Sequence, residues 1–329
     1  LRAPRVFLER ILPKLTHKLE DFADIRFGIK TGANDFFYMK NISHLFEADH
    51  LGNPKGFEEW GVKASTGGEL EKLGLAYVEN EGGHRFVINK KDVKPIIKSP
   101  RQLGKYSVAE SVTLCLYTSS PGPLTKKYID WGEKKTIEVR GGRETRKGYH
   151  RLESTKNRNP WYRLADLTPT HIILPKSLMD RLFIPFSQDP VLCDNRFYTL
   201  DAKECHKAWM YLNSILFLIT VELYARRLGG GANDMMVDDY KEMPFPDLNK
   251  LDIDYDPKML WRREVLRYYD EVEQADKKAL DIAVLKGMGF SDVETLVQAL
   301  YRSYVELVED RLTKAGSSRV ERLGQENVS

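Results

Sequence analysis

The chain has 329 residues, of which 42% are hydrophobic, and this is enough for a packed core. Its most apolar run, residues 215–221, is far shorter than the roughly 20 residues that a membrane span requires. Lysine and arginine total 51 against 48 acidic residues, so the net charge of +3 indicates nothing about partners until its distribution is examined.

The three cysteines, Cys115, Cys193 and Cys205, are far apart and odd in number, which argues against a disulfide framework and fits a reducing cytosol. Cys205 precedes His206, but no second ligand pair lies nearby, so we expect no metal site. No signal peptide is recognisable, and we expect a cytoplasmic protein without a membrane partner.

Residues 1–20 carry a partly amphipathic pattern interrupted by Pro13, which predicts a linker or a short helix. The chain begins with Leu1 rather than methionine. We therefore expect this piece to follow an upstream portion of a longer protein.

Two short runs rich in β-branched and aromatic residues, 25–29 and 36–39, flank a polar loop. Gly32 and Asn34 in that loop tolerate positive φ, as a tight connection requires. The pattern predicts strand, loop, strand, and the plainest reading is an ordinary hairpin.

Further strands are expected downstream, each bounded by Gly, Pro, Asn or Asp, at residues 85–88, 112–117, 171–174, 182–184 and 196–200. Between residues 203 and 228, Trp209, Leu212, Leu216, Ile219 and Leu223 recur at spacings of three and four. This periodicity predicts one helix that ends at the glycines 229–231.

After residue 246 an acidic connector leads to Pro257, where a first-turn proline is well tolerated. Two heptad-like apolar stripes follow, separated by Gly287 and Gly289, and they predict a helical hairpin. We place a helical region at 251–315 and a disordered tail at 316–329.

A basic stretch runs from Lys126 to Arg163 and contains twelve basic and five acidic residues. Its arginines are interleaved with glycines and aromatic residues, a composition suited to neutralising phosphates and to bidentate contacts with guanine. A solvated loop whose charges serve solubility is the alternative. No P-loop, GxGxxG, GxSxG or HExxH motif accompanies it.

The tetrapeptide Asn159-Pro160-Trp161-Tyr162 resembles the Asn-Pro-Pro-Tyr motif with which adenine methyltransferases hold a flipped base. Trp161 replaces the second proline, and no Gly-rich strand-to-helix turn for a nucleotide-like cofactor precedes it. A divergent methyltransferase acting through Asn159–Tyr162 stays open as an alternative function.

An ordered series of motifs resembles the TaqI-like C-terminal specificity domain of adenine-specific DNA methyltransferases, including single-chain restriction-modification enzymes. The matching segments are 28–37, 93–97, 160–164, 194–198, 212–214, 229–231 and 239–244. The resemblance implies an α+β fold, with a mixed sheet-and-helix target recognition domain at 21–250 followed by the helical hairpin.

The resemblance also implies a DNA-reading role in a restriction-modification or phage-defence system, with double-stranded DNA and an upstream methyltransferase domain of the same protein as partners. S-adenosylmethionine is expected in the missing domain, with no cofactor in this chain, so we expect no methyl transfer by this chain alone. Restriction or defence subunits are further candidate partners, and a protein-interaction module of a defence complex, docking through the hairpin, is a third function.

The residues expected at the DNA come from the matched loop, the basic stretch and the motif at 194–198. They are Lys30, Thr31, Asn34, Asp35, Arg140, Arg143, Arg146, Lys147, Arg158, Asn195 and Arg196.

Overall fold

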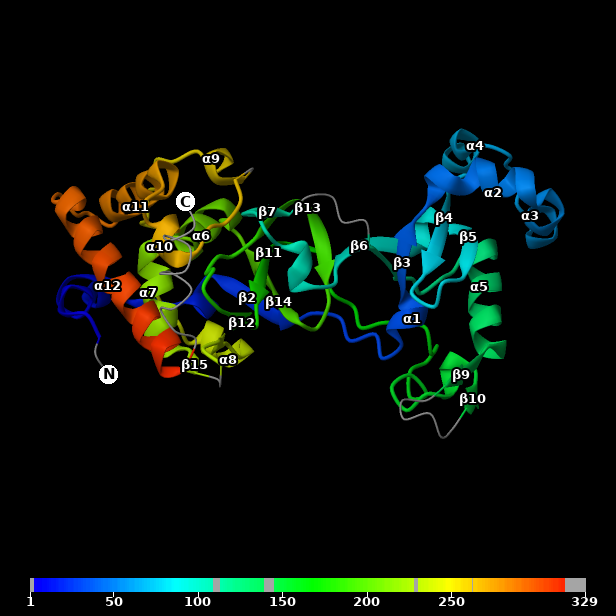
Figure 1. Ribbon diagram of the computed structural model, residues 1–329, viewed down its shortest axis with the longest axis horizontal. Helices are drawn as coiled ribbons and strands as arrows, with labels where there is room; N and C mark the ends of the chain where they lie inside the picture. Colours follow the sequence, from blue (N-terminus) through cyan, green and yellow to red (C-terminus); the bar gives the residue numbers. More distant parts are fainter. Residues whose placement is uncertain (1–2, 109–112, 139–144, 228–229, 262, 317–329) are drawn as a thin grey trace.

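The computed structural model describes residues 3–108, 113–138, 145–227, 230–261 and 263–316. The molecule is elongated, with a helix-rich first lobe at one end and a second lobe at the other (Figure 1). Within the described residues no helix is long and apolar enough to cross a membrane.

A ten-stranded mixed sheet runs through both lobes. Its main path contains, in spatial order, β2 (Ala23–Phe27), β14 (Phe197–Ala202), β11 (Thr170–Pro175), β13 (Phe186–Cys193), β6 (Val93–Ile97), β8 (Thr113–Leu116), β3 (Tyr38–Asn41), β4 (Leu75–Asn80) and β5 (Arg85–Asn89). The strand β7 (Ser107–Val108) pairs with β13 off this path. The β13–β6 and β13–β7 pairs are parallel, and the other pairs of this sheet are antiparallel.

Three small ladders complete the described strands. They are β1 (His17–Lys18) with β17 (Pro244–Phe245), β9 (Thr136–Glu138) with β10 (Thr145–Lys147), and β12 (Ser177–Leu178) with β16 (Asn233–Asp234) and β15 (Arg226–Arg227).

The helices divide between the lobes (Figure 1). The first lobe holds α6 (Cys205–Leu212), α7 (Ile215–Tyr224), α8 (Val237–Lys241), α9 (Lys258–Trp261), α10 (Tyr268–Glu271), α11 (Ala275–Gly287) and α12 (Val293–Lys314). The second lobe holds α1 (Asn34–Phe37), α2 (Phe46–Gly52), α3 (Pro54–Trp60), α4 (Gly67–Lys72) and α5 (Pro123–Lys134). The expected α+β class and the C-terminal helical segment are confirmed.

Each lobe has its own core. In the first, buried residues of α6, α7, α11 and α12 pack with those of β11 and β14, and Phe7 and Ile11 join the same cluster. In the second lobe, Phe36, Tyr128 and Trp161 belong to a hydrophobic cluster that includes residues of β3, β4 and β8. A small cluster that includes Ile97, Ile173 and Phe197 lies where β13 pairs with β6, so the lobes are joined through packed strands.

The two runs around the polar loop do not form the expected hairpin. The strand β2 lies at one end of the main sheet path, whereas β3 lies beyond β6 and β8. Phe36 and Phe37 belong to the short helix α1, and the strand begins only at Tyr38. The loop therefore crosses from one lobe to the other, because Ile29 pairs with Asp194 in the middle of the sheet instead of turning back on β2.

The single helix expected at 203–228 is two helices that break at Asn213 and Ser214. The Asn213 side chain accepts from Ile184 N at 2.8 Å and donates to Ile184 O at 3.0 Å, as a neighbouring strand would. Trp209 Nε1 also donates to Ile184 O, at 2.7 Å. Residues 182–184 are consequently not a strand, since side chains satisfy the Ile184 backbone.

Candidate nucleic-acid interface

The loop after β2 lies directly against the turn between β13 and β14. Gly28 N donates to Phe197 O at 3.1 Å, Ile29 N to Cys193 O at 2.7 Å, and Asn195 N to Ile29 O at 2.9 Å. A Cβ at Gly28 would lie 2.2 Å from the Asp194 carbonyl oxygen, so only glycine allows this approach. The loop and the turn thus form one rigid unit.

Segment 149–158 holds the rest of the loop. Ser154 Oγ donates to Gly32 O at 2.6 Å, and Tyr149 OH donates to the Asp35 carboxylate at 2.6 Å. Thr31 is buried and its hydroxyl donates to Asn34 Oδ1. Thr31 and Asp35 therefore shape the loop from inside.

The structure brings together four of the residues expected at the DNA, namely Lys30, Arg158, Asn195 and Arg196. Lys30 and Arg196 are exposed, and Arg158 Nη2 donates to Lys30 O at 2.9 Å. Arg158 Nη1 is buried and has no hydrogen-bond partner in the described part of the chain. Burial lowers the pKa of Arg158, as expected for a cation that is partly removed from water.

The remaining expected residues lie elsewhere or outside the described structure. Arg146 and Lys147 are on β10, where Arg146 Nη1 lies 3.4 Å from the Glu153 carboxylate. Arg140 and Arg143 fall outside the described residues. Asn34 is exposed at the start of α1.

Asp194 is the centre of a group of cations that sequence reasoning largely missed. Its carboxylate is buried and accepts from Tyr38 OH and from Arg196 N, the latter at 2.9 Å. Burial and the bond to Asp194 together raise the pKa of Tyr38, so the phenol stays protonated and donates. The negative charge of the same carboxylate acts on Lys98 and Lys176 and favours their charged forms.

Strand register places three lysines on one face of the sheet. Tyr38 on β3, Cys115 on β8 and Lys94 on β6 are directly opposite one another, and Lys40 is opposite Thr113. Paired residues project to the same side of a sheet, and residues two apart along a strand do too. Lys94, Lys98 and Lys40 therefore project from one face of β6, β8 and β3, which we call the Lys94 face. Tyr38, Ile96 and Cys115 on the same face are fully buried.

The opposite face is covered. Met39 lies opposite Asn80 and Leu114, and Asn80 Nδ2 donates to the hydroxyl of Tyr128 on α5 at 3.2 Å. Helices α2 to α4 cover the β4–β5 end of the Lys94 face, where Tyr77 and Val87 pack with Phe46 and Leu70.

Lys98 and Lys176 are the partly desolvated cations of this region. Burial, reinforced by the neighbouring Arg196, lowers the pKa of Lys98, which also forms an ion pair with Glu81. Burial likewise lowers the pKa of Lys176. Because a bound anion would favour the charged form of both, the two lysines suit an anionic ligand.

An aromatic side chain is exposed beside Lys176. Phe27, at the end of β2, is 54% exposed and packs edge-on against Tyr198 with ring centroids 5.3 Å apart. The Lys176 ammonium lies 5.2 Å from the Phe27 centroid and 4.8 Å from that of Tyr198. We define the Asp194 cluster as Lys40, Lys98, Lys176 and Arg196, with Phe27 beside it. Only Arg196 had been selected from sequence, because the others become neighbours through strand pairing.

The tetrapeptide Asn159–Tyr162 lies at the edge of the second core. Trp161 is 8% exposed and donates from Nε1 to the Glu133 carboxylate at 2.8 Å. Its ring contacts Phe36 at a centroid distance of 4.9 Å. The indole is therefore a packing residue, while Asn159 is exposed.

The glycines at 230–231 offer no cradle for a nucleotide-like cofactor, because they lie between β15 and β16, which pair antiparallel, instead of joining a strand to a helix. Within the described ranges, no group of three or more His, Cys, Asp or Glu side chains is arranged to hold a metal ion.

The solved structures of similar fold include a restriction endonuclease. The chain is similar to the type IIG restriction endonuclease BpuSI, with 11% identity and a TM-score of 0.58 over 94% of this chain and 33% of that chain. A second match is the type IIL restriction-modification enzyme MmeI in complex with DNA, with 11% identity and a TM-score of 0.40 over 89% of this chain and 36% of that one.

The chain thus spans about a third of the length of the enzymes it matches. The likeness to BpuSI, at this identity, concerns the fold. No protein-family model and no curated protein matches the sequence.

Proposed function

We propose that this chain is the DNA sequence-recognition part of a site-specific adenine DNA methyltransferase of a restriction-modification or phage-defence system. In this proposal it binds double-stranded DNA and leaves methyl transfer, with its S-adenosylmethionine, to another domain of the same protein. The fold shared with a restriction endonuclease over 94% of the chain supports a role on DNA.

The observation that carries the proposal is the convergence of Lys98, Lys176 and Arg196 around a buried carboxylate already engaged by Tyr38, with Lys40 near Lys98. Phosphates of a duplex are the anions that such a spread of cations neutralises, with release of counterions. Exposed Phe27 adds an apolar contact of the kind that meets bases.

A salt series of duplex binding tests the proposal. We expect the logarithm of affinity to fall linearly with the logarithm of salt concentration, by about 0.9 for each neutralised phosphate. Lys176→Gln with Arg196→Gln should weaken binding and flatten the slope. Lys126→Gln with Lys134→Gln, on the helix that covers the opposite sheet face, is the matched control. Salt-independent affinity, or equal losses in both pairs, would contradict the proposal.

Selection from a random duplex library addresses the recognition role. An enriched motif containing adenine supports a specificity function, whereas binding without any enriched motif removes it. Calorimetry with S-adenosylmethionine separates the alternative enzyme, since a measurable heat for this chain would favour catalysis through Asn159–Tyr162. Exchange of this chain between related enzymes should transfer the recognised sequence.

A further inference from the structure

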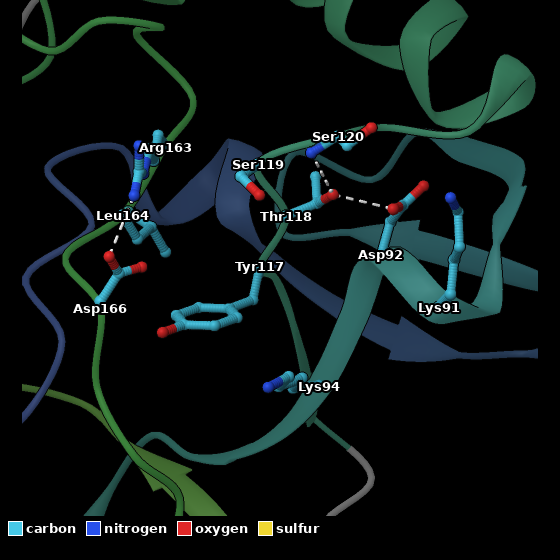
Figure 2. Close-up of a pocket in the computed structure, with 10 residues that line it drawn as sticks. All are labelled: Lys91, Asp92, Lys94, Tyr117, Thr118, Ser119, Ser120, Arg163, Leu164 and Asp166. Carbon is cyan, nitrogen blue, oxygen red and sulfur yellow. Dashed lines mark hydrogen bonds and ion pairs between the residues drawn. The ribbon is translucent and has the colours of Figure 1, made fainter.

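A second group of basic side chains surrounds a cavity beside Lys94. A cavity of about 270 Å³ is lined by three separate segments: residues 91–94, the turn 117–120 after β8, and 163–166. Figure 2 shows Lys91, Lys94 and Arg163 around it, with the hydroxyls of Ser119 and Ser120 on the connecting turn. Basic groups and hydroxyl donors thus converge from different parts of the chain.

The acidic groups at this cavity are already engaged. Asp92 is 1% exposed and accepts from Thr118 Oγ1 at 2.8 Å and from Gly122 N at 2.7 Å. Asp166 pairs with Arg163 at 3.0 Å. The buried Asp92 therefore fixes the turn that presents Ser119 and Ser120, and the charge of the exposed Asp166 is paired with Arg163.

The two lysines lack such partners. In the described part of the chain, neither Lys91 nor Lys94 forms an ion pair with a carboxylate. The Lys94 ammonium lies 4.8 Å from the ring centroid of Tyr117, whose hydroxyl accepts from Leu167 N at 2.8 Å. The ring is thus held in place, and it positions the ammonium at the cavity.

We propose that this cavity binds a phosphate group, and, resting on the proposed function, that in the complex it is a backbone phosphate of the same duplex. Lys94 and Lys98 are four residues apart on one face, which places their backbones about 13 Å apart along β6. That separation corresponds to roughly four base-pair steps of 3.4 Å along a duplex. One polyanion therefore reaches both the Asp194 cluster and the cavity.

The test uses the double variant Lys91→Gln with Lys94→Gln, in the full chain, against the control Lys126→Gln with Lys134→Gln. For the cavity variant we expect duplex affinity to fall roughly tenfold at moderate salt and the salt slope to decrease by about one unit, as for one lost phosphate contact. Ethylation of single backbone phosphates should identify one position that impairs the wild type but leaves the cavity variant unaffected. Wild-type affinity and slope in the cavity variant would overturn the inference.

A titration with inorganic phosphate, followed by NMR, distinguishes this inference from the proposed function. In one outcome the wild type binds no duplex, phosphate shifts the signals of Tyr117, and the cavity variant abolishes that shift. The cavity then binds free phosphate, and the DNA proposal is wrong. If the wild type binds duplex while ethylation and the cavity variant show no shared position, the DNA proposal stands and the cavity proposal falls. A wild type that binds neither removes both.

Discussion

At the scale of single residues, Phe27 combines exposure with a fixed position. Tyr198 and Lys176 hold its ring, although more than half of its surface faces solvent. The sequence could not reveal this, because an alternating apolar residue in β2 is expected to face a core. Its exposure follows from its position at the last residue of the strand, where the chain leaves for the second lobe.

We expect Phe27→Ala to weaken duplex binding by roughly 5- to 100-fold, the range for losing one aromatic contact with a base. Because the side chain is exposed, the free energy of unfolding should change by less than about 1 kcal/mol. Fluorescence anisotropy and urea unfolding measure the two effects. Leu51→Ala, at a residue 78% exposed in the second lobe, is the control. Equal affinities of both variants and the wild type would exclude Phe27 from the interface.

The lowered pKa of Lys176 leads us to expect that duplex binding depends on pH. Burial lowers its pKa in the free protein, and a phosphate beside it favours the charged form. Affinity should therefore be lost as pH rises through the lowered pKa, below the pH at which an ordinary lysine loses its proton. Lys176→Arg, which keeps its charge, should show a flatter profile by anisotropy. Parallel profiles for the two proteins would show that Lys176 is not at the phosphate.

The lowered pKa of Lys176 also affects the stability of the folded protein, and this effect changes with pH in the opposite direction to the affinity. The folded state disfavours charged Lys176 relative to the unfolded chain, so this cost applies below the lowered pKa. It is relieved as pH rises from there toward the ordinary lysine value of about 10.4.

At the scale of elements, a buried ion pair connects α12 and α7. Arg311 Nε donates to Glu222 at 2.9 Å, with side chains 1% and 0% exposed. Arg311 also donates to the carbonyl oxygens of Gly231 and Met179, and Asn233 donates to Glu222 at 2.9 Å. One guanidinium therefore fixes the β15–β16 ladder against both helices.

Arg311→Met should destabilise the protein by about 3–5 kcal/mol, because it leaves the Glu222 carboxylate buried without its cation. Adding Glu222→Leu should restore part of the loss, since no uncompensated charge then remains. Urea unfolding measures both changes. Arg302→Met, at an exposed position of the same helix, controls for the length change, and a loss as small as in this control would contradict the assigned role.

The elements could be predicted wherever the local pattern and the final packing agree. The strands β5, β8, β11 and β14 and the helices α11 and α12 fall on the expected apolar runs. The pattern was misleading at residues 203–228, where Asn213 ends one helix by binding Ile184 from a distant segment. It also missed β13, which contains Asp189 and Pro190, and α5, which lies inside the basic stretch.

The candidate interface was predictable only where it is local. Lys30, Asn195 and Arg196 came from short motifs, whereas Lys40, Lys98 and Lys176 come from segments separated by many residues. The pairing of β13 with β6, and of β8 with β3, brings them together. Such non-local register has no signature in a single sequence.

At the scale of the whole molecule, the sheet continues through both lobes and connects the two proposed anion-binding regions. We expect a duplex at about 100 times its dissociation constant to raise the free energy of unfolding by about 2.7 kcal/mol. Hydrogen exchange should slow at the 193–198 turn in the middle of the sheet and at 91–98 in the second lobe. Helices α11 and α12 should change little. Slowing confined to one of the two regions would show that the duplex does not span them.

Under the proposed DNA-reading role, the exposure of side chains in β3, β6 and β8 also bears on how new target sequences arise. The outward positions Lys40, Lys94 and Thr113 keep part of their surface in solvent, whereas Tyr38, Ile96 and Cys115 on the same face are buried. Point changes at the outward positions alter the chemistry offered to a base or a phosphate without disturbing the interior. A gene library randomised only at these positions should therefore yield folded proteins with diverse DNA-sequence preferences. Mutation at this sheet could then change the recognised sequence without loss of the fold.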